Sequence, residues 1–316
     1  MGRTEAGVMV SRCATLAALL EVSAYPKPGN VHRTWDFPDT RYEHFLAGSV
    51  AMGTAMGKLA IRGFDAERGL IEWRNIGVGR HILEAVSDTL NWQSGGNVNL
   101  GVALLFAPMA AAGGAAVGDN KVDVENHGEK LRKVIHSTTP DDAVSVYEAI
   151  RMAMTPRVLG EVEDLDVHDD SSLQRIMDQG LTLLDVFERC SERDSICEEW
   201  VSNFETTFEV GYPYLKRSLE EARDINSAIL DTFLFILSRK PDSLIRRKSG
   251  LKKACEVSRK ARIILDEGGS GSARGSELLH KLDDDLHRGE GALNPGTTAD
   301  LTAASIFVAL LEGWRP

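Results

Sequence analysis

Residues 100–117 read LGVALLFAPMAAAGGAAV, a run of eighteen residues without a charged side chain. That length is the lower limit for a membrane-spanning helix. The run contains Pro108 and the pair Gly113-Gly114, however, and five of its last eight residues are alanine. Such small side chains let neighbouring helices approach closely, so the segment predicts a central helix that is buried on all sides rather than a membrane span.

Outward from this segment, apolar residues recur at helical spacing, and patterns typical of strands are scarce. Thr139-Pro140-Asp141-Asp142 is a helix-start signal, because threonine caps, proline suits the first turn and the acids face the positive end of the helix dipole. Glycine and serine are frequent in residues 268–276, which predicts a surface loop. Further helical segments are predicted at residues 42–56, 181–190, 200–208, 229–237 and 301–311. We therefore predict an all-α fold with one multi-helix domain over residues 1–316.

Composition narrows the classes of function. A hydrophobic content of 43% and a charged content of 26% are typical of a globular protein. The net charge of -11 argues against a nucleic-acid-binding surface, which needs clustered Lys and Arg. The densest basic cluster, Arg246, Arg247 and Lys248 with Lys252 and Lys253, could still form a local pocket.

The cysteines and the first apolar stretch bear on location. The four cysteines form no CxxC and no zinc-finger spacing, so we expect reduced thiols, mostly buried, in a cytoplasmic protein. The apolar stretch 13–20 is short and ends at Glu21, which argues against a secretory signal. Apolar faces on several helices are compatible with a homodimer, although the sequence shows no interface.

A stiff turn, EVSAYPKPGNV, follows the first predicted helix at residues 21–31. Two prolines flank Lys27, and Gly29 permits positive φ or the close approach of a ligand. A lysine on a stiff turn suits an anionic phosphate, and Asp36 and Asp39 downstream could hold Mg²⁺ together with phosphate oxygens. The alternative is an interhelical turn with solvated charges.

A second segment, SGGNVNLG at residues 94–101, opens the apolar helix. Glycines before a helix N-terminus can cradle an anion through free backbone N–H groups. Asn97 and Asn99 could bind a base, a ribose or a metal-bound water. The alternative is a helix cap with packing glycines, since the pattern is neither a dinucleotide fingerprint nor a P-loop.

Two later segments add charge. In PDSLIRRKSG, at residues 241–250, Arg246 and Arg247 could neutralise a polyphosphate, although a solvated charge run explains them equally simply. In NPGTTAD, at residues 294–300, Thr297 or Thr298 is predicted to cap the last helix. Asp300 then lies in the first turn of that helix, either as a capping acid or in a pocket.

A rival interpretation rests on His168-Asp169, because helical HD phosphohydrolases use such a pair with further metal ligands. The flanking acids resemble a solvated loop instead; they are Glu163, Asp164, Asp166 and Asp170. The sequence contains neither HExxH nor GxSxG, which excludes the corresponding metalloprotease and hydrolase signatures.

Taken together, these segments resemble the triphosphoribosyl-dephospho-CoA synthase family. The resemblance runs from about Glu21 to the C-terminus, and the order of PKPG and NPGxxAD is its most specific part. Matching stretches are EVSAYPKPGNV (21–31), NVNLGVALLFAP (97–108), YEAIR (147–151), LG (159–160), DV (166–167), PDSLIRRKSG (241–250) and NPGTTADL (294–301).

The resemblance implies that the 2′-hydroxyl of dephospho-CoA attacks C1′ of the ATP ribose, adenine leaves, and the triphosphate stays attached. The transition state is oxocarbenium-like, as in glycoside hydrolysis. The reaction needs a base for the hydroxyl, a group that assists the departure of adenine, and cations for the triphosphate, including Mg²⁺.

Candidates for phosphate and nucleotide binding are Lys27, Gly29, Asn30, Asn97, Asn99, Arg246, Arg247 and Asn294. Catalytic candidates are Glu21, Asp36 and Asp300, with Glu21 as the base or as a residue that positions the turn. Metal candidates are Asp36, Asp39 and Asp300.

The sequence also departs from the bacterial pattern. Thr34-Trp-Asp-Phe37 stands where bacterial members tend to carry His-x-Asp-Met, and Leu100 stands where they tend to carry a basic residue. The chain thus resembles a divergent, archaeal-type branch. Two alternatives to the family reaction stay open at this point. One is ribosyl transfer to another acceptor or nucleotide hydrolysis, and the other is a non-catalytic nucleotide-binding regulator.

Overall fold

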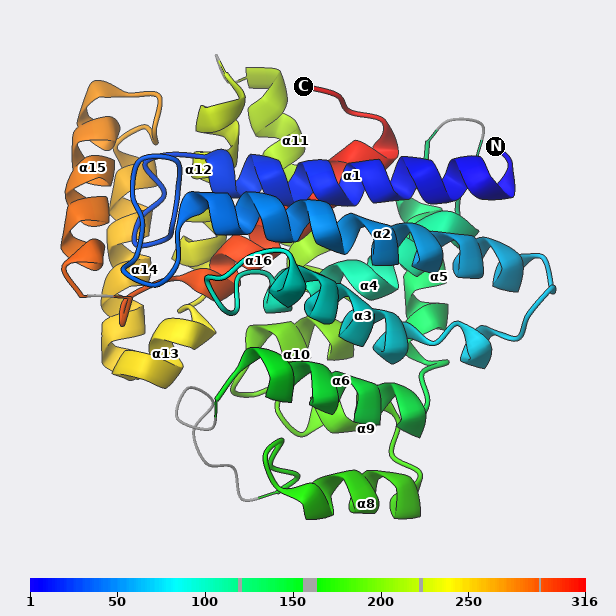
Figure 1. Cartoon of the computed structure of the whole chain (residues 1–316). Coiled ribbons are helices and arrows are strands. Elements are labelled where there is room, and N and C mark those ends of the chain that lie inside the picture. The colour runs from blue at the N-terminus through cyan, green and yellow to red at the C-terminus, as the bar shows by residue number, and fades with distance from the viewer. Residues whose placement is uncertain (119–120, 156–163, 222–223, 290) are drawn as a thin grey trace.

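The apolar segment forms helix α4, Leu100–Ala115, at the centre of a computed structural model that describes residues 1–118, 121–155, 164–221, 224–289 and 291–316 (Figure 1). Within these residues the chain forms helices and two isolated β-bridges but no strand, which confirms the all-α prediction. Every residue of α4 except Gly101 is buried, as expected for the central helix.

The other helices are numbered along the chain, as labelled in Figure 1. Those of the first half are α1 Arg3–Ser23, α2 Tyr42–Glu67, η1 Trp73–Asn75, α3 Val78–Asn91, α5 Val124–Ile135 and α6 Pro140–Ala153. Those of the second half are α8 Asp170–Gln179, α9 Leu183–Glu188, α10 Ser195–Val201, η2 Thr206–Gly211, α11 Tyr212–Glu221, α12 Ile225–Arg239, α13 Ser243–Ser249, α14 Leu251–Asp266, α15 Ala273–His287 and α16 Gly296–Glu312.

Small residues allow the close packing of α4 that its composition predicts. A Cβ on Gly63 of α2 would overlap the carbonyl group of Ala111, and a Cβ on Gly114 would overlap that of Ala60. The backbones of α2 and α4 therefore touch, which only glycine at these two positions permits. On another side of α4, the rings of Phe106 and Phe307 lie 4.6 Å apart and join it to α16.

Helix α1 is long and apolar enough to cross a membrane by length and composition, but half of its most apolar eighteen-residue window is buried inside the protein. It packs along α2 and α16, as a core helix does (Figure 1). The segment at residues 100–117 forms a helix of only sixteen residues, enclosed by protein, so its prediction as a buried helix is confirmed.

Other local predictions have mixed outcomes. Thr139 caps α6, and its backbone N–H donates to Asp142 Oδ2 at 2.9 Å, as predicted. The prediction of one helix over residues 200–208 is wrong, because Asn203 and Phe204 have positive φ between α10 and the π-helical η2. The predicted loop 268–276 is shorter, since Ser272 caps α15 and the helix begins at Ala273.

The start of α16 also differs from the prediction. The helix begins at Gly296, before either predicted capping threonine. Thr298 donates instead to Asp242 Oδ2, from its backbone N–H at 2.7 Å and from its hydroxyl at 2.8 Å. The other carboxylate oxygen of Asp242 accepts from the backbone N–H groups of Leu244 and Ile245 and so caps α13. One buried carboxylate therefore fixes the N-termini of α13 and α16 next to each other.

Candidate active site

A cavity of about 630 Å³ lies where the N-terminal ends of α4, α10 and α16 meet α6, α13 and the turn after α1. This volume is typical of a small-molecule site, and helix N-termini favour anionic ligands. Residues from segments far apart in the sequence line it together. The predicted site residues among them are Glu21, Lys27, Asn30, Asn97, Asn99, Arg246, Arg247, Asn294 and Asp300.

Lys27 and Glu21 form a buried ion pair at one wall of the cavity. The ammonium group contacts Glu21 Oε1 and donates to the Glu21 carbonyl oxygen at 3.1 Å. Only 1% of Lys27 and 6% of Glu21 is exposed. Burial raises the pKa of the Glu21 carboxyl, and the ammonium of Lys27 offsets that rise in part. The lysine thus reaches the cavity already neutralised by a carboxylate, a partner that the sequence analysis did not predict.

Asp300 lies beyond the first turn of α16 rather than within it as predicted, because the helix begins at Gly296. Burial raises its pKa well above the usual range, and the negative charges of Glu21, Asp242 and Asp194 add to the rise. Its carboxylate lies against the backbone of Gly101, where any Cβ would overlap Oδ2. The glycine of the NVNLG segment and the acid of the NPGTTAD segment are therefore in direct contact.

The four asparagines of the predicted site have different surroundings. Asn97 accepts from the backbone N–H of Leu100 at 3.2 Å, and buried Asn99 hydrogen bonds with Ser49 at 3.2 Å, so both also shape the start of α4. Asn30 Nδ2 donates to the carbonyl oxygen of Pro28 at 3.3 Å. Asn294 Oδ1 is buried and has no hydrogen-bond partner. An unsatisfied buried acceptor at a cavity wall is costly unless a ligand or water binds it.

The two predicted phosphate-binding arginines are held by the segment between α9 and α10. Arg246 Nη1 donates to the carbonyl oxygen of Glu192 at 3.0 Å, and Arg247 Nη1 lies 3.1 Å from Asp194 Oδ2. A disulfide between Cys190 and Cys197 closes this segment, with Cα atoms 5.9 Å apart. The prediction that the thiols are reduced is therefore wrong for these two cysteines, while Cys13 and Cys255 are free.

Several further charged residues line the cavity, and none of them was predicted from the sequence. Arg189 and Arg193 line it from the segment that carries the disulfide, and Arg189 pairs with Asp164. Asp194 lines it as well and caps α10, with Ile196 N–H donating to Oδ1 at 2.8 Å. No motif marked these residues. Their only signal was the density of charge at residues 188–194.

Three predicted site residues do not line the cavity. Asp36 is exposed and accepts from the backbone N–H of Tyr42 at 2.8 Å, near the start of α2, and Asp39 is exposed as well. Gly29 has a φ of 71°, as predicted, but its close neighbour is α15 rather than a ligand, because a Cβ there would lie 2.8 Å from the Cβ of Leu286. Its role is to let the turn pack against protein.

The rival HD interpretation finds little support in the described residues. His168 does not line the cavity, and Asp169 caps α8 by accepting from the backbone N–H of Ser171 at 2.9 Å. The family-like pair at residues 159–160 and the acid Glu163 lie outside the residues that the structure describes.

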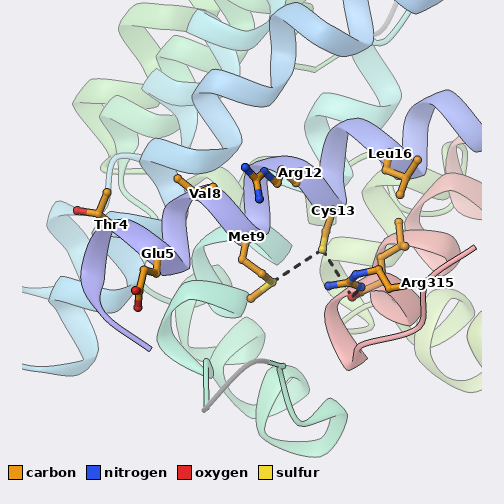
Figure 2. A pocket seen from close by; sticks show the side chains of 9 residues that line it. Thr4, Glu5, Val8, Met9, Arg12, Cys13, Leu16 and Arg315 are labelled. Atoms are coloured by element: carbon orange, nitrogen blue, oxygen red, sulfur yellow. Dashed lines mark hydrogen bonds between the residues drawn. The ribbon is translucent and has the colours of Figure 1, made fainter.

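A second cavity, of about 390 Å³, lies on the other side of α1, between its first turns and the end of α16 (Figure 2). Cys13 faces it, and its thiol donates to the carbonyl oxygen of Leu310. Burial raises the pKa of this thiol to about 11, so it is protonated and unreactive at neutral pH. The lining of this cavity combines apolar side chains with Thr4, Glu5, Arg12 and Arg315.

Some known proteins are similar to about a third of the chain, and others are similar to nearly all of it. A probable 2-(5''-triphosphoribosyl)-3'-dephosphocoenzyme-A synthase of Pseudomonas fluorescens is 35% identical over 115 residues, which is 36% of this chain. That alignment covers only 39% of the length of the relative. The 2-(5''-triphosphoribosyl)-3'-dephosphocoenzyme-A synthase of Klebsiella pneumoniae is 25% identical over 304 residues, which covers 93% of this chain and 87% of the relative.

A solved structure shares the fold. The crystal structure of an Archaeoglobus fulgidus protein assigned to the triphosphoribosyl-dephospho-CoA synthases superposes with a TM-score of 0.64 and 26% identity, over 87% of this chain and all of the other. The family itself matches over residues 9–316, which include every wall of the cavity. The chain therefore belongs to the ATP:dephospho-CoA triphosphoribosyl transferase family.

Proposed function

We propose that this protein transfers the 5-triphosphoribosyl group of ATP to the 2′-hydroxyl of 3′-dephospho-CoA and releases adenine. The observation that carries the proposal is one cavity lined by two kinds of group. Neighbouring carboxyls with raised pKa values, Glu21 and Asp300, line it together with Arg246 and Arg247. This is the chemistry that a reaction with a proton transfer and a retained triphosphate requires.

The arginines of the cavity are suited to bind the triphosphate. Arginine binds phosphate oxygens in a bidentate manner, and four arginines line this cavity: Arg189, Arg193, Arg246 and Arg247. Lys27, Arg189 and Arg247 are each paired with a carboxylate, whereas Arg246 donates to a backbone carbonyl oxygen. We assign the phosphate charge mainly to the arginines because four of them line the cavity, and we assign Lys27 a neutralising role near the ribose.

The carboxyls of the cavity are suited to the proton transfer. The hydroxyl of the acceptor loses a proton as its oxygen bonds to C1′, and adenine gains a proton as its bond to C1′ breaks. One carboxyl can serve both steps if its pKa lies near the working pH. Asp300 fits because burial and Glu21 raise its pKa, so that it accepts the hydroxyl proton and can return it. Asn294 Oδ1, unpaired in the protein, is available to a ribose hydroxyl or the amino group of adenine.

Mg²⁺ is part of the proposal, with a revised set of ligands. Within the described residues, the groups of three convergent metal-ligating side chains do not include the cavity carboxyls. Mg²⁺ usually needs only one or two carboxylates when phosphate oxygens and water complete its shell. Asp36 and Asp39 do not line the cavity, so the ligand role falls to Asp300, as an alternative to its role in proton transfer, with the side-chain oxygen of Asn294. When bound, the ion would neutralise charge on the triphosphate.

We also propose that the protein works in the cytoplasm as a soluble enzyme, without nucleic-acid or membrane partners, and that it forms a homodimer. Family membership supports the location, and the net charge of -11 argues against a nucleic-acid partner. Exposed apolar side chains such as Trp92 and Leu70 support self-association. Light scattering on the purified protein checks the mass, and a monomer at micromolar concentration would remove the dimer from the proposal.

The test of the function is a reaction with ATP, Mg²⁺ and dephospho-CoA, followed by mass spectrometry. Adenine and the triphosphoribosyl adduct should form in equal amounts, and neither should form when dephospho-CoA is left out. Adenine without dephospho-CoA would show hydrolysis or another acceptor. Tight ATP binding without any product would show a regulator instead. Family membership favours neither of these alternatives.

A further inference from the structure

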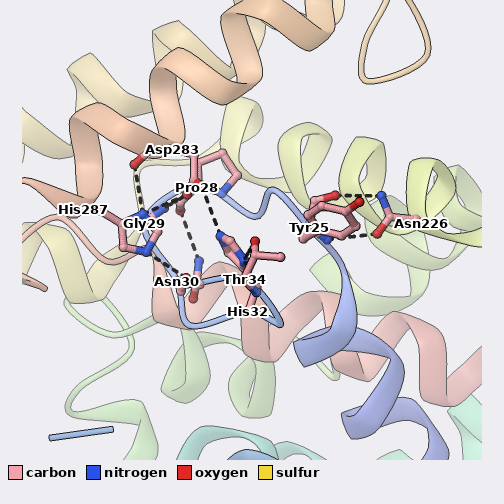
Figure 3. Close-up of polar contacts among 9 residues, drawn as sticks. All are labelled: Tyr25, Pro28, Gly29, Asn30, His32, Thr34, Asn226, Asp283 and His287. Carbon is pink, nitrogen blue, oxygen red and sulfur yellow. Dashed lines mark hydrogen bonds and ion pairs between the residues drawn. The ribbon is translucent and has the colours of Figure 1, made fainter. Parts of the chain in front are cut away.

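Hydrogen bonds hold the PKPGN turn, residues 26–30, to α12 and α15, one on each side of the turn (Figure 3). At its start, the side chain of Asn226 accepts from Tyr25 N–H at 2.9 Å and donates to the Tyr25 carbonyl oxygen at 2.8 Å. At its end, helix α15 holds the turn through two residues. Asp283 Oδ1 accepts from Gly29 N–H at 3.1 Å, and His287 Nε2 donates to the carbonyl oxygen of Asn30 at 3.1 Å.

The hydrogen bonds of His287 decide its protonation state. Its Nδ1 lies 3.0 Å from the carbonyl oxygen of Asp283 and 2.9 Å from Asp283 Oδ1, while Nε2 faces the carbonyl oxygen of Asn30. A carbonyl oxygen can only accept a hydrogen bond. Both ring nitrogens must therefore carry a proton for both bonds to form, which makes the ring an imidazolium.

The surroundings of the ring are compatible with a positive charge. Asp283 supplies the counter-charge, and it also accepts from His32 Nε2 at 3.1 Å. The Trp35 ring stacks on His287 with centroids 4.3 Å apart, an arrangement in which a cation is attracted to the aromatic face. Among the described residues, the titratable groups that contact the ring are Asp283 from its own helix and His32 from the turn.

The titration of these groups agrees with the geometry. Burial opposes the charge on His287, but its hydrogen bonds and the charge of Asp283 outweigh burial and raise its pKa. Burial likewise acts to raise the pKa of Asp283, but hydrogen bonds from His287 and His32 lower it to about 2. Both shifts therefore favour the ionised pair.

We propose that His287 is a positioning residue whose imidazolium form holds the PKPGN turn, and with it Lys27 and Asn30, at the active cavity. Deprotonation removes one of the two N–H donors, so either the bond to Asn30 or the bond to Asp283 is lost. The turn then loosens as the pH rises through the pKa of His287. The effect on catalysis rests on the proposed function, but the protonation state does not.

A metal ion is the competing explanation of this cluster. The ligand atoms of His32, Asp283 and His287 lie within 4.8 Å of one another, close enough for a shared cation. A metal would need a free lone pair on each histidine, however, and both nitrogens of His287 point at carbonyl oxygens. The hydrogen bonds thus favour the proton over the metal.

The first test reads the ring directly in the intact wild-type protein. Nitrogen-15 NMR of labelled histidine should show both nitrogens of His287 protonated at about pH 7, above the usual pKa of histidine near 6.5. Assignment uses loss of the signal in His287→Gln. One unprotonated ring nitrogen at this pH would overturn the proposal, and so would stoichiometric zinc in the purified protein that is lost in the variant. Neither result depends on transferase activity.

The second test compares the pH dependence of kcat/KM. His287→Gln should lower kcat/KM by roughly tenfold at about pH 6, and the ratio to wild type should approach one at high pH, where the wild-type ring is neutral. Asn226→Ala loosens the other end of the turn and should lower activity by the same factor at every pH. His280→Gln, an exposed histidine on the same helix, should change nothing. A constant ratio for His287→Gln across the pH range would show a purely structural role.

Discussion

The carboxylate of Asp300 lies against the backbone of Gly101, in the space that a side chain at residue 101 would occupy. The contact joins two motifs that are 199 residues apart in the chain, NVNLG and NPGTTAD, at the wall of one cavity. Glycine is required here because the carboxylate of Asp300 occupies the space of a side chain at the start of α4.

Gly101→Ala should therefore reduce activity without unfolding the protein. The added Cβ displaces the end of a flexible side chain, which is cheap, and alanine is the better helix former by about 0.5–1 kcal/mol. We expect kcat/KM to fall by roughly 100-fold with little change in Tm. Gly113→Ala on the same helix is the matched control, because its Cβ would lie 3.4 Å from Leu311 Cδ1 and far from the cavity. Full activity in Gly101→Ala would show that the position of Asp300 does not matter.

Asp300→Asn should abolish most turnover yet stabilise the protein. A carboxyl whose pKa is raised by folding favours the folded state at low pH and loses that contribution as the pH rises from its unfolded value, about 3.9, through its folded value. At about pH 8 the variant should melt a few degrees above wild type, and the difference should vanish below about pH 4. Activity should fall by roughly 100-fold or more. Equal melting temperatures at both pH values would contradict the raised pKa.

Arg246→Ala should weaken ATP binding by about tenfold or more, because a charged hydrogen-bond donor to phosphate is lost. Calorimetric titration with MgATP measures the change. Lys252→Ala removes the same charge from an exposed position close by in the sequence and should leave the affinity unaltered at physiological salt. An equal loss in both variants would mean that the net charge, rather than this cavity, attracts the nucleotide.

The Cys190–Cys197 disulfide should support nucleotide binding, since it closes the segment that holds Arg246 and Arg247. Replacing both cysteines by serine should destabilise the protein by about 2 kcal/mol and weaken ATP binding severalfold. Cys255→Ser, at an exposed free thiol, is the control. Thiol titration of the unreduced, unfolded protein should find two of the four cysteines free; four free thiols would contradict the disulfide.

Helical periodicity and composition were sufficient to predict the architecture. The uncharged run at residues 100–117 predicted the buried central helix, and the signal at Thr139 predicted the start of α6. Prediction failed where a distant partner overrides local preference. Thr298 would cap α16 in isolation, but the buried carboxylate of Asp242 takes both of its donors.

The same reason explains the outcome for the site. Turn and cap signals predicted Lys27, Asn30, Asn294 and Asp300 as site residues, and all four line one cavity. Asp36 followed the turn in sequence, but closeness along the chain does not fix direction, and its carboxylate faces the start of α2 instead.

The residues that were missed lack a local signature. Arg189 and Arg193 lie in a charged segment between two short helices, and a spacing of seven does not reveal that Cys190 and Cys197 pair. His287 differs from the exposed His280 through contacts that the sequence does not mark, among them Asn30, which lies 257 residues earlier in the chain.

The most direct test of the central claim follows the label of [γ-³²P]ATP in a reaction with dephospho-CoA. Under the proposed transfer, the label moves into the dephospho-CoA adduct, unlabelled adenine is released in equal amount, and Asp300→Asn stops both. ADP with labelled phosphate, or label that stays on ATP while adenine is absent, would contradict transfer of the intact triphosphoribosyl group.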